Sequence, residues 1–152
     1  MTEQSTVYIP PTHGVRRPGV FIPPLLVIPF IIYNLVVFAF MGGNPDGWDT
    51  ELFTIPMVSR VPWSLSAGGL MLVLGLGCLF VEVLKSTQTG RNSVIEHMLS
   101  TLLLVVFLVE FIIVGAAASS VFFLLMIMSV VDVVAGFTIS ITGAGRDVTM
   151  GG

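Results

Sequence analysis

The chain has 152 residues, of which 55% are hydrophobic and only 10% are charged, and its formal net charge is −3. A soluble domain carries about 25% charged residues, so this chain lacks the polar surface that a water-soluble protein of its size needs. The nearly neutral charge gives no electrostatic support to a nucleic-acid partner, and the single cysteine, Cys78, excludes an internal disulfide.

Four apolar stretches are each long enough to cross a lipid bilayer as a helix, because about 20 residues span the hydrocarbon thickness of about 30 Å. They cover residues 20–41, 63–84, 98–118 and 120–143, with tails at 1–19 and 144–152. The sequence therefore predicts an all-α membrane protein built as a four-transmembrane-helix bundle.

The first stretch is rich in proline. Pro23 and Pro24 suit a helix start, where the missing amide donor costs nothing. Pro29 lies about one turn further on and cannot donate to the carbonyl of Leu25, so we expect a kink or a loosened turn there.

A polar segment at residues 42–62 separates the first two stretches. The sequence Asn44-Pro45-Asp46-Gly47 is typical of a turn. We expect Asp49 to cap a short surface helix that runs through Phe53 and ends at Pro56. The segment is too short for a domain, so it predicts a short interfacial element lying on the membrane surface.

Two tryptophans, Trp48 and Trp63, flank this segment. Indole side chains favour the boundary between membrane and water. We therefore interpret Trp48 and Trp63 as interface anchors.

The second stretch contains a glycine-rich helix face. Gly68 with Gly75, and Gly69 with Gly77, fall about two turns apart on similar faces. Small residues let helix backbones approach closely inside a membrane. These four glycines predict a helix-packing face, whose partner is either a neighbouring helix or another subunit.

The apolar sequence then runs almost unbroken from Met98 to Ile141. One helix of that length would be about 65 Å long, twice the hydrocarbon thickness. We therefore expect the chain to fold back, at the segment from Gly115 to Ser120.

The basic residues predict the orientation. A cytoplasmic N-terminus puts five basic residues inside and only Arg60 outside, which requires an even number of spans. The five are Arg16, Arg17, Lys85, Arg91 and Arg146. This pattern favours four spans with both termini in the cytoplasm.

Three polar side chains, Asn34, Glu110 and Asp132, lie well inside the apolar stretches. Counted along the helices from the cytoplasmic side, all three fall near the midplane, about 16–21 Å deep. The sequence offers no Lys, Arg or His at that level, so an ionised carboxylate there is costly. We expect at least one of the two acids to be protonated and to donate a hydrogen bond to the other acid or to Asn34.

This buried polar cluster has three open interpretations. It is a neutral interhelical hydrogen-bonded cluster, worth about 0.6–2 kcal/mol, or a proton or cation relay, or a set of groups that pairs with donors on another chain. Nearer the inner surface, we expect Glu82 to pair with Lys85 or to extend toward water, and Glu96 with His97 to form a solvated helix start.

No cofactor, metal site or catalytic residue is expected. A b-type haem needs two histidines on facing helices, whereas His13 and His97 both fall in predicted cytoplasmic segments. A zinc site finds no support in a chain with one cysteine.

Three segments, Phe80-Val-Glu-Val-Leu-Lys85, Val109-Glu-Phe111 and Asp132-Val-Val-Ala-Gly136, resemble those of an uncharacterised family of small four-helix bacterial inner-membrane proteins. The resemblance covers about the second half of the chain. It implies four spans in a bacterial inner membrane, and it implies no activity and no functional residues.

The glycine face, the polar cluster and the small soluble segments favour a non-enzymatic role. We expect a structural or accessory membrane subunit that self-associates or joins a larger membrane complex. The alternative is a small oligomeric proton or cation pathway that uses Glu110 and Asp132.

Overall fold

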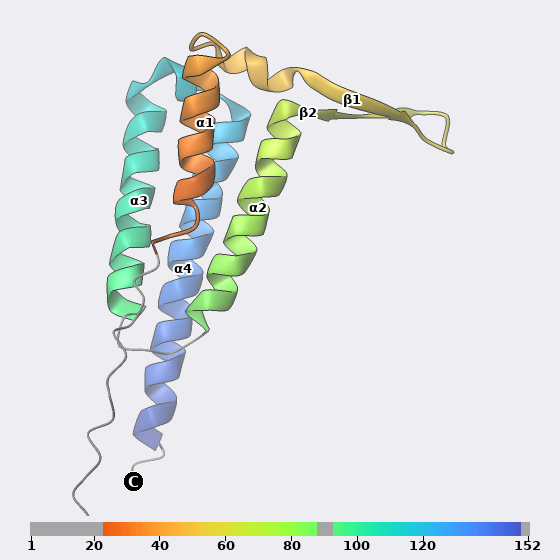
Figure 1. Cartoon of the computed structure of the whole chain (residues 1–152). Helices are drawn as coiled ribbons and strands as arrows, with labels where there is room; N and C mark the ends of the chain where they lie inside the picture. The colour runs from red at the N-terminus through yellow and green to blue at the C-terminus, as the bar shows by residue number, and fades with distance from the viewer. Residues whose placement is uncertain (1–22, 88–92, 150–152) are drawn as a thin grey trace, which may run out of the picture.

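The computed structural model describes residues 23–87 and 93–149, and within them the chain is mostly helical (Figure 1). In chain order, the elements are α1 (Val27–Ala39), the 3-10 helix η1 (Pro45–Asp49), β1 (Glu51–Pro56), β2 (Pro62–Ser66), α2 (Ala67–Ser86), α3 (Ser93–Ile113), the 3-10 helix η2 (Gly115–Ala117) and α4 (Ser120–Thr149). The four α-helices form a bundle in which α4 contacts both α2 and α3, and α1 lies against α2 and α4.

Three of these helices are long and apolar enough to cross a membrane. They cover Ala67–Ser86, Ile95–Ile113 and Ser120–Ile139. The protein is therefore a helical membrane protein with several candidate spans, as the composition predicts. The first predicted span corresponds to α1, which has 13 residues and is about 20 Å long. By length and composition alone, α1 falls short of a complete crossing.

The chain reverses where the length of the apolar run predicts it. Helix α3 ends at Ile113, η2 forms the turn, and α4 begins at Ser120. The Ala117 amide donates to the Val114 carbonyl (3.0 Å), which closes this turn. The third and fourth apolar stretches are therefore separate antiparallel helices. The β-hairpin formed by β1 and β2 projects from this same end of the bundle (Figure 1). We therefore call this end the hairpin end, and the opposite end the Lys85 end.

Pro29 does not kink a helix, contrary to expectation. Helix α1 begins at Val27, so Pro29 lies in its first turn, where an amide donor is not needed. Pro29 has no amide hydrogen to donate to the Leu25 carbonyl. That carbonyl accepts instead from the Ile28 amide (3.0 Å).

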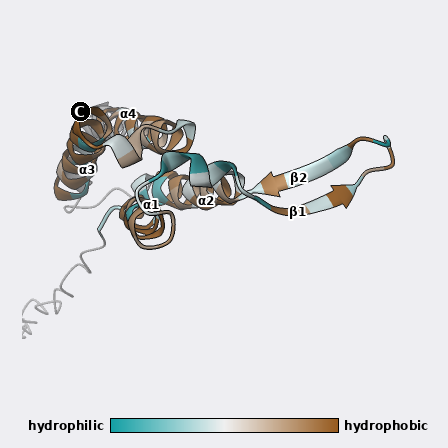
Figure 2. Ribbon diagram, turned by 90° about the horizontal axis from the view of Figure 1, so that it is seen from above, coloured by the Kyte–Doolittle hydropathy of each residue, from teal (hydrophilic) through white to brown (hydrophobic). Residues whose placement is uncertain are grey.

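The prediction of a surface helix from Asp49 to Phe53 is wrong. Asp49 ends η1 instead, and strands β1 and β2 follow as an antiparallel hairpin. The hairpin projects sideways from the bundle, as Figure 2 shows from above. Apolar and polar side chains alternate from Phe53 to Ile55 in β1 and from Trp63 to Ser66 in β2, and a period of two favours a strand. After β2, the Ser66 hydroxyl accepts from the Gly69 amide (3.0 Å) and caps α2.

An aromatic core fills the bundle toward the hairpin end. Tyr33, Phe107 and Phe122 are fully buried, and the Tyr33 hydroxyl donates to the Ala116 carbonyl (2.8 Å). The Trp48 ring stacks on Tyr33 at 4.8 Å between centroids and is only 3% exposed. Trp48 is therefore a core residue, and its interpretation as an interface anchor is wrong. Trp63 lies in β2 and remains largely exposed.

Two of the four glycines of the predicted packing face, Gly68 and Gly75, pack against another helix of this chain. A Cβ atom on Gly68 would lie 2.6 Å from Val121, and one on Gly75 would lie 2.5 Å from Leu125, so these two glycines allow α2 to approach α4 closely. Gly69 instead faces Leu65, and Gly77 has open space beside it. Gly69 and Gly77 therefore contact no other helix within the described residues, and their place in a face that meets another subunit stays a prediction.

Candidate functional site: two groups of polar side chains

The structure separates the three polar residues that the sequence places at one level. Glu110 is three residues before the end of α3 at Ile113, so it lies about 5 Å from the hairpin end. Asp132 is 12 residues beyond the start of α4 at Ser120, so it lies about 18 Å from the same end. The prediction of a single midplane cluster is therefore wrong, because α4 continues to Thr149, beyond the predicted boundary at 143, and Asp132 lies beside Ser100 near the start of α3.

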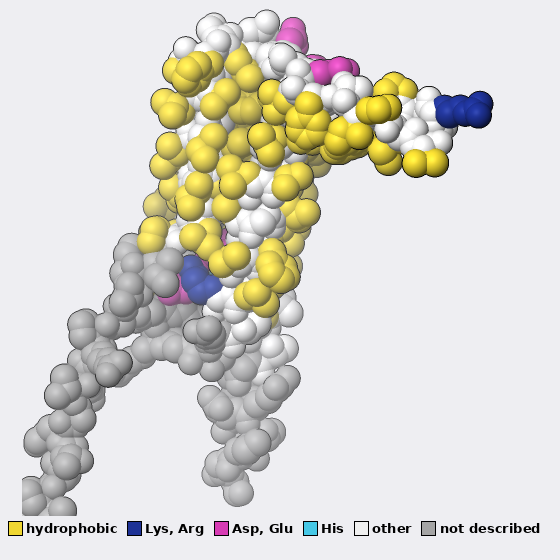
Figure 3. Space-filling model, turned by 45° about the vertical axis from the view of Figure 1, so that its right-hand side comes forward, with side chains coloured by type: hydrophobic (Ala, Val, Ile, Leu, Met, Phe, Trp, Pro, Cys, Tyr) yellow, Lys and Arg dark blue, Asp and Glu magenta, His cyan; other side chains and the backbone are white. Residues whose placement is uncertain are grey.

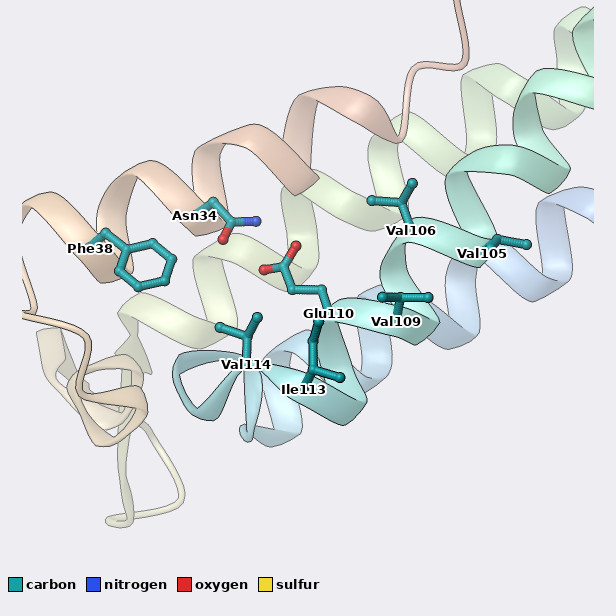
Figure 4. Close-up of a pocket in the computed structure, with 8 residues that line it drawn as sticks. All are labelled: Asn34, Phe38, Val105, Val106, Val109, Glu110, Ile113 and Val114. Carbon is teal, nitrogen blue, oxygen red and sulfur yellow. The ribbon is translucent and has the colours of Figure 1, made fainter.

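Glu110 is paired with Asn34 across α3 and α1. Figure 4 shows the carboxyl and the amide pointing toward each other. The Asn34 amide nitrogen also donates to the Phe30 carbonyl of its own helix (3.2 Å). The structure thus brings together two of the three predicted residues and forms a polar contact between α1 and α3.

Asp132 belongs to a second group, which we call the Lys85 cluster. Its members come from α2, α3 and α4 and lie toward the Lys85 end of the bundle. They are Glu82, Lys85, Glu96, His97, Ser100 and Asp132. At its centre, the Lys85 ammonium is 2.7 Å from Glu82 Oε1 and 3.8 Å from Glu96 Oε2. The ion pair expected between Glu82 and Lys85 is therefore confirmed.

Asp132 is only 4% exposed and has charged neighbours. It interacts with the Ser100 hydroxyl and, electrostatically, with Lys85, His97 and Glu82. The expectation that no basic group is available to the buried acids is therefore wrong for Asp132. The long Lys85 side chain turns inward and is only 17% exposed, so it brings its charge into the bundle.

His97 also lies inside the bundle, contrary to expectation. It is part of α3, is buried, and its ring is 5.7 Å from that of Phe137 on α4. Gly136 makes this position possible, since a Cβ there would lie 2.6 Å from two atoms of the imidazole. This contact between α3 and α4 was not predicted, although a glycine at position 136 was its signal in the sequence.

Glu82 joins α1 to the cluster. Its second oxygen, Oε2, accepts a hydrogen bond from the Leu25 amide (2.8 Å) immediately before α1. Amides at a helix start have no partner within the helix, so a buried carboxylate is a favourable acceptor. Through Glu82 and its neighbours, the Lys85 cluster therefore contacts all four helices.

The chemistry of the cluster is that of a buried ion-pair network. One ammonium faces the carboxyl groups of Glu82, Glu96 and Asp132, so removing it would leave acidic groups without compensation. Within residues 23–87 and 93–149, no group of three or more His, Cys, Asp or Glu side chains is placed to hold a metal ion.

Comparisons with protein-family models, with curated proteins and with solved structures found no match to this chain. The fold and the polar groups thus define a class, the multi-pass helical membrane proteins, and they identify no family. The resemblance noted in the sequence gains no support from these comparisons.

Proposed function

We propose that the chain is a non-enzymatic integral membrane protein that acts as a structural or accessory subunit, either self-associating or joining a larger membrane complex. The observation that carries the proposal is that the buried charged side chains of this protein pair with groups on neighbouring helices. Glu82 contacts both Lys85 and the Leu25 amide, and Lys85 also contacts Glu96, so these groups hold helices together. Charged groups inside a membrane protein are costly, and pairing between helices is a stable way to retain them.

The hairpin supports an associating role. Phe53, Ile55, Trp63 and Leu65 pair across the strands on one face, whereas Thr54 and Ser64 occupy the other face and share a hydrogen bond (2.8 Å). Figure 3 shows hydrophobic side chains gathered along the hairpin and over the helices below it. A two-stranded hairpin is at best marginally stable alone, so an apolar face of this kind favours contact with another protein chain.

The proposal includes a topology with four spans and both termini in the cytoplasm. The contact between Glu82 and Leu25 supports it, because it holds the start of α1 only four residues before the end of α2 at Ser86. From there, α1 runs toward the hairpin end. Lys85 lies at the end that the basic residues assign to the cytoplasm, and Arg60 lies in the hairpin turn at the other end. The proposed location in a bacterial inner membrane rests only on the family resemblance of the sequence.

The alternative, a proton or cation pathway through Glu110 and Asp132, has a weaker basis. It needs the two acids within reach of each other, and they differ in depth by about 13 Å along antiparallel helices.

Substitutions on the apolar face of the hairpin test the proposed association. We expect the wild-type protein, extracted directly from its membrane into nanodiscs, to have the mass of an oligomer or a larger complex. The double variant Ile55→Ser/Trp63→Ser should fall to the monomer mass, because it removes exposed apolar area from the contact. Mass photometry measures both.

Ser64→Thr on the opposite face is the matched control and should keep the wild-type mass. A monomeric wild-type protein with no associated chain would overturn the proposed function.

A further inference from the structure

A groove of about 470 Å³ lies on the outer surface between α1 and α3, around Glu110 (Figure 4). Val105, Val106, Val109 and Phe38 form much of its wall, and each is 41–56% exposed. The surface that these side chains offer is apolar and runs along α3. Such a groove fits a hydrocarbon chain in its size and chemistry.

Among the described residues, Asn34 and Glu110 are the only polar side chains that line the groove. The Glu110 side chain is partly exposed in the groove, and the Asn34 amide is the only hydrogen-bond donor beside it in the described part of the chain (Figure 4). A carboxylate with a single amide neighbour is costly inside a membrane. A positively charged hydrogen-bond donor entering the groove would be its best complement.

The depth of Glu110 indicates where that donor comes from. Helix α3 has 21 residues and is about 31 Å long, close to the hydrocarbon thickness. Glu110 lies about 5 Å from one end of it, so its side chain can reach the level of lipid headgroups. The valine wall extends from there toward the bilayer centre.

We propose that this groove binds a membrane lipid whose headgroup carries a primary ammonium, the chemistry of phosphatidylethanolamine. The ammonium donates to Glu110, and one acyl chain lies along the valines. A partner helix fits less well, because the lining side chains include none of the small residues that let helix backbones approach closely. This inference is separate from the proposed association through the hairpin.

Native mass spectrometry tests the proposal. The full-length protein is released from nanodiscs that contain equal amounts of phosphatidylethanolamine and phosphatidylcholine, and the lipids that stay bound to it are identified. Phosphatidylcholine has the same charge but no N–H donor. We expect the wild-type protein to retain phosphatidylethanolamine over phosphatidylcholine by about tenfold, the factor expected for a hydrogen bond to a charged group. Glu110→Gln should bring that ratio close to one.

Two further variants make the result specific. Glu51→Gln removes an exposed acid near the same end of the bundle but outside the groove, and it should keep the wild-type ratio. Val109→Phe fills the groove while keeping Glu110, so it should abolish retention of both lipids, and it decides the question if Glu110→Gln fails to fold. A wild-type ratio near one, or a tenfold preference that survives Glu110→Gln or Val109→Phe, would overturn the proposal.

Discussion

Lys85→Met should lower the free energy of unfolding by about 3 kcal/mol, the scale measured when one partner of a buried ion pair is removed. The methionine keeps most of the apolar stem, so the loss comes mainly from the missing charge. Glu82, Glu96 and Asp132 would then share a buried site without a compensating ammonium. Equilibrium unfolding of the purified protein in mixed micelles, followed by circular dichroism, measures the change.

Two variants separate charge from packing at this site. Lys85→Arg keeps the positive charge and should lose less stability than Lys85→Met. The double variant Glu82→Gln/Lys85→Met removes both charges, but the glutamine can still accept from the Leu25 amide, so it should recover part of the loss. A surface substitution usually changes the free energy of unfolding by no more than about 0.5 kcal/mol. If the unfolding free energy of Lys85→Met differs from that of the wild type by no more than this, the ion-pair network does not stabilise the bundle.

Gly75→Leu should be comparably damaging, because it forces α2 away from α4. A Cβ atom alone would lie 2.5 Å from the Leu125 side chain and 3.0 Å from the Met128 sulfur. Overpacking of this kind costs about 1–3 kcal/mol, and a full leucine at a helix contact should reach the upper part of that range. The same unfolding measurement applies.

Gly77→Leu is the matched control, two residues along the same helix. Open space surrounds Gly77, so leucine there should leave the unfolding free energy almost unchanged. Gly75→Ala should fall between the two leucine variants. Equal effects of leucine at positions 75 and 77 would contradict the close contact between α2 and α4.

The helical part of this fold could be predicted from the sequence because its signals are long. A run of apolar residues from Met98 to Ile141 is too long for one crossing, so a reversal was required, and the structure places it between Ile113 and Ser120. Such length arguments tolerate errors of a few residues. The presence of helices and of the final turn was therefore predictable.

The segment between the first two helices was less predictable, because short signals compete there. Asp49 and Pro56 suggest a capped helix, whereas the alternation in Phe53-Thr54-Ile55 favours a strand, and the strand is what forms. A tryptophan beside a polar segment suggests an interface anchor, but the Trp48 ring stacks on Tyr33 and is buried there. Contacts of this kind join residues far apart in the sequence.

The polar groups illustrate the limits of counting depth along a sequence. The count assumed that α4 ends level with the start of α3, but α4 continues to Thr149, so Asp132 lies beside Ser100 and not beside Glu110. Inward-turned side chains add a second error, since Lys85 was assigned to the membrane surface and instead compensates buried acids. Asn34 and Glu110 do lie together, because both occupy the same end of adjacent helices.

Proton and cation flux can be measured in liposomes that contain the purified protein. This measurement decides whether the buried ionisable groups conduct ions or only hold helices together. We predict that flux through the wild-type protein equals that of empty liposomes and that Asp132→Asn and Glu110→Gln leave it there. A wild-type flux above this background, abolished by Asp132→Asn in a variant that still inserts and assembles, would contradict this prediction.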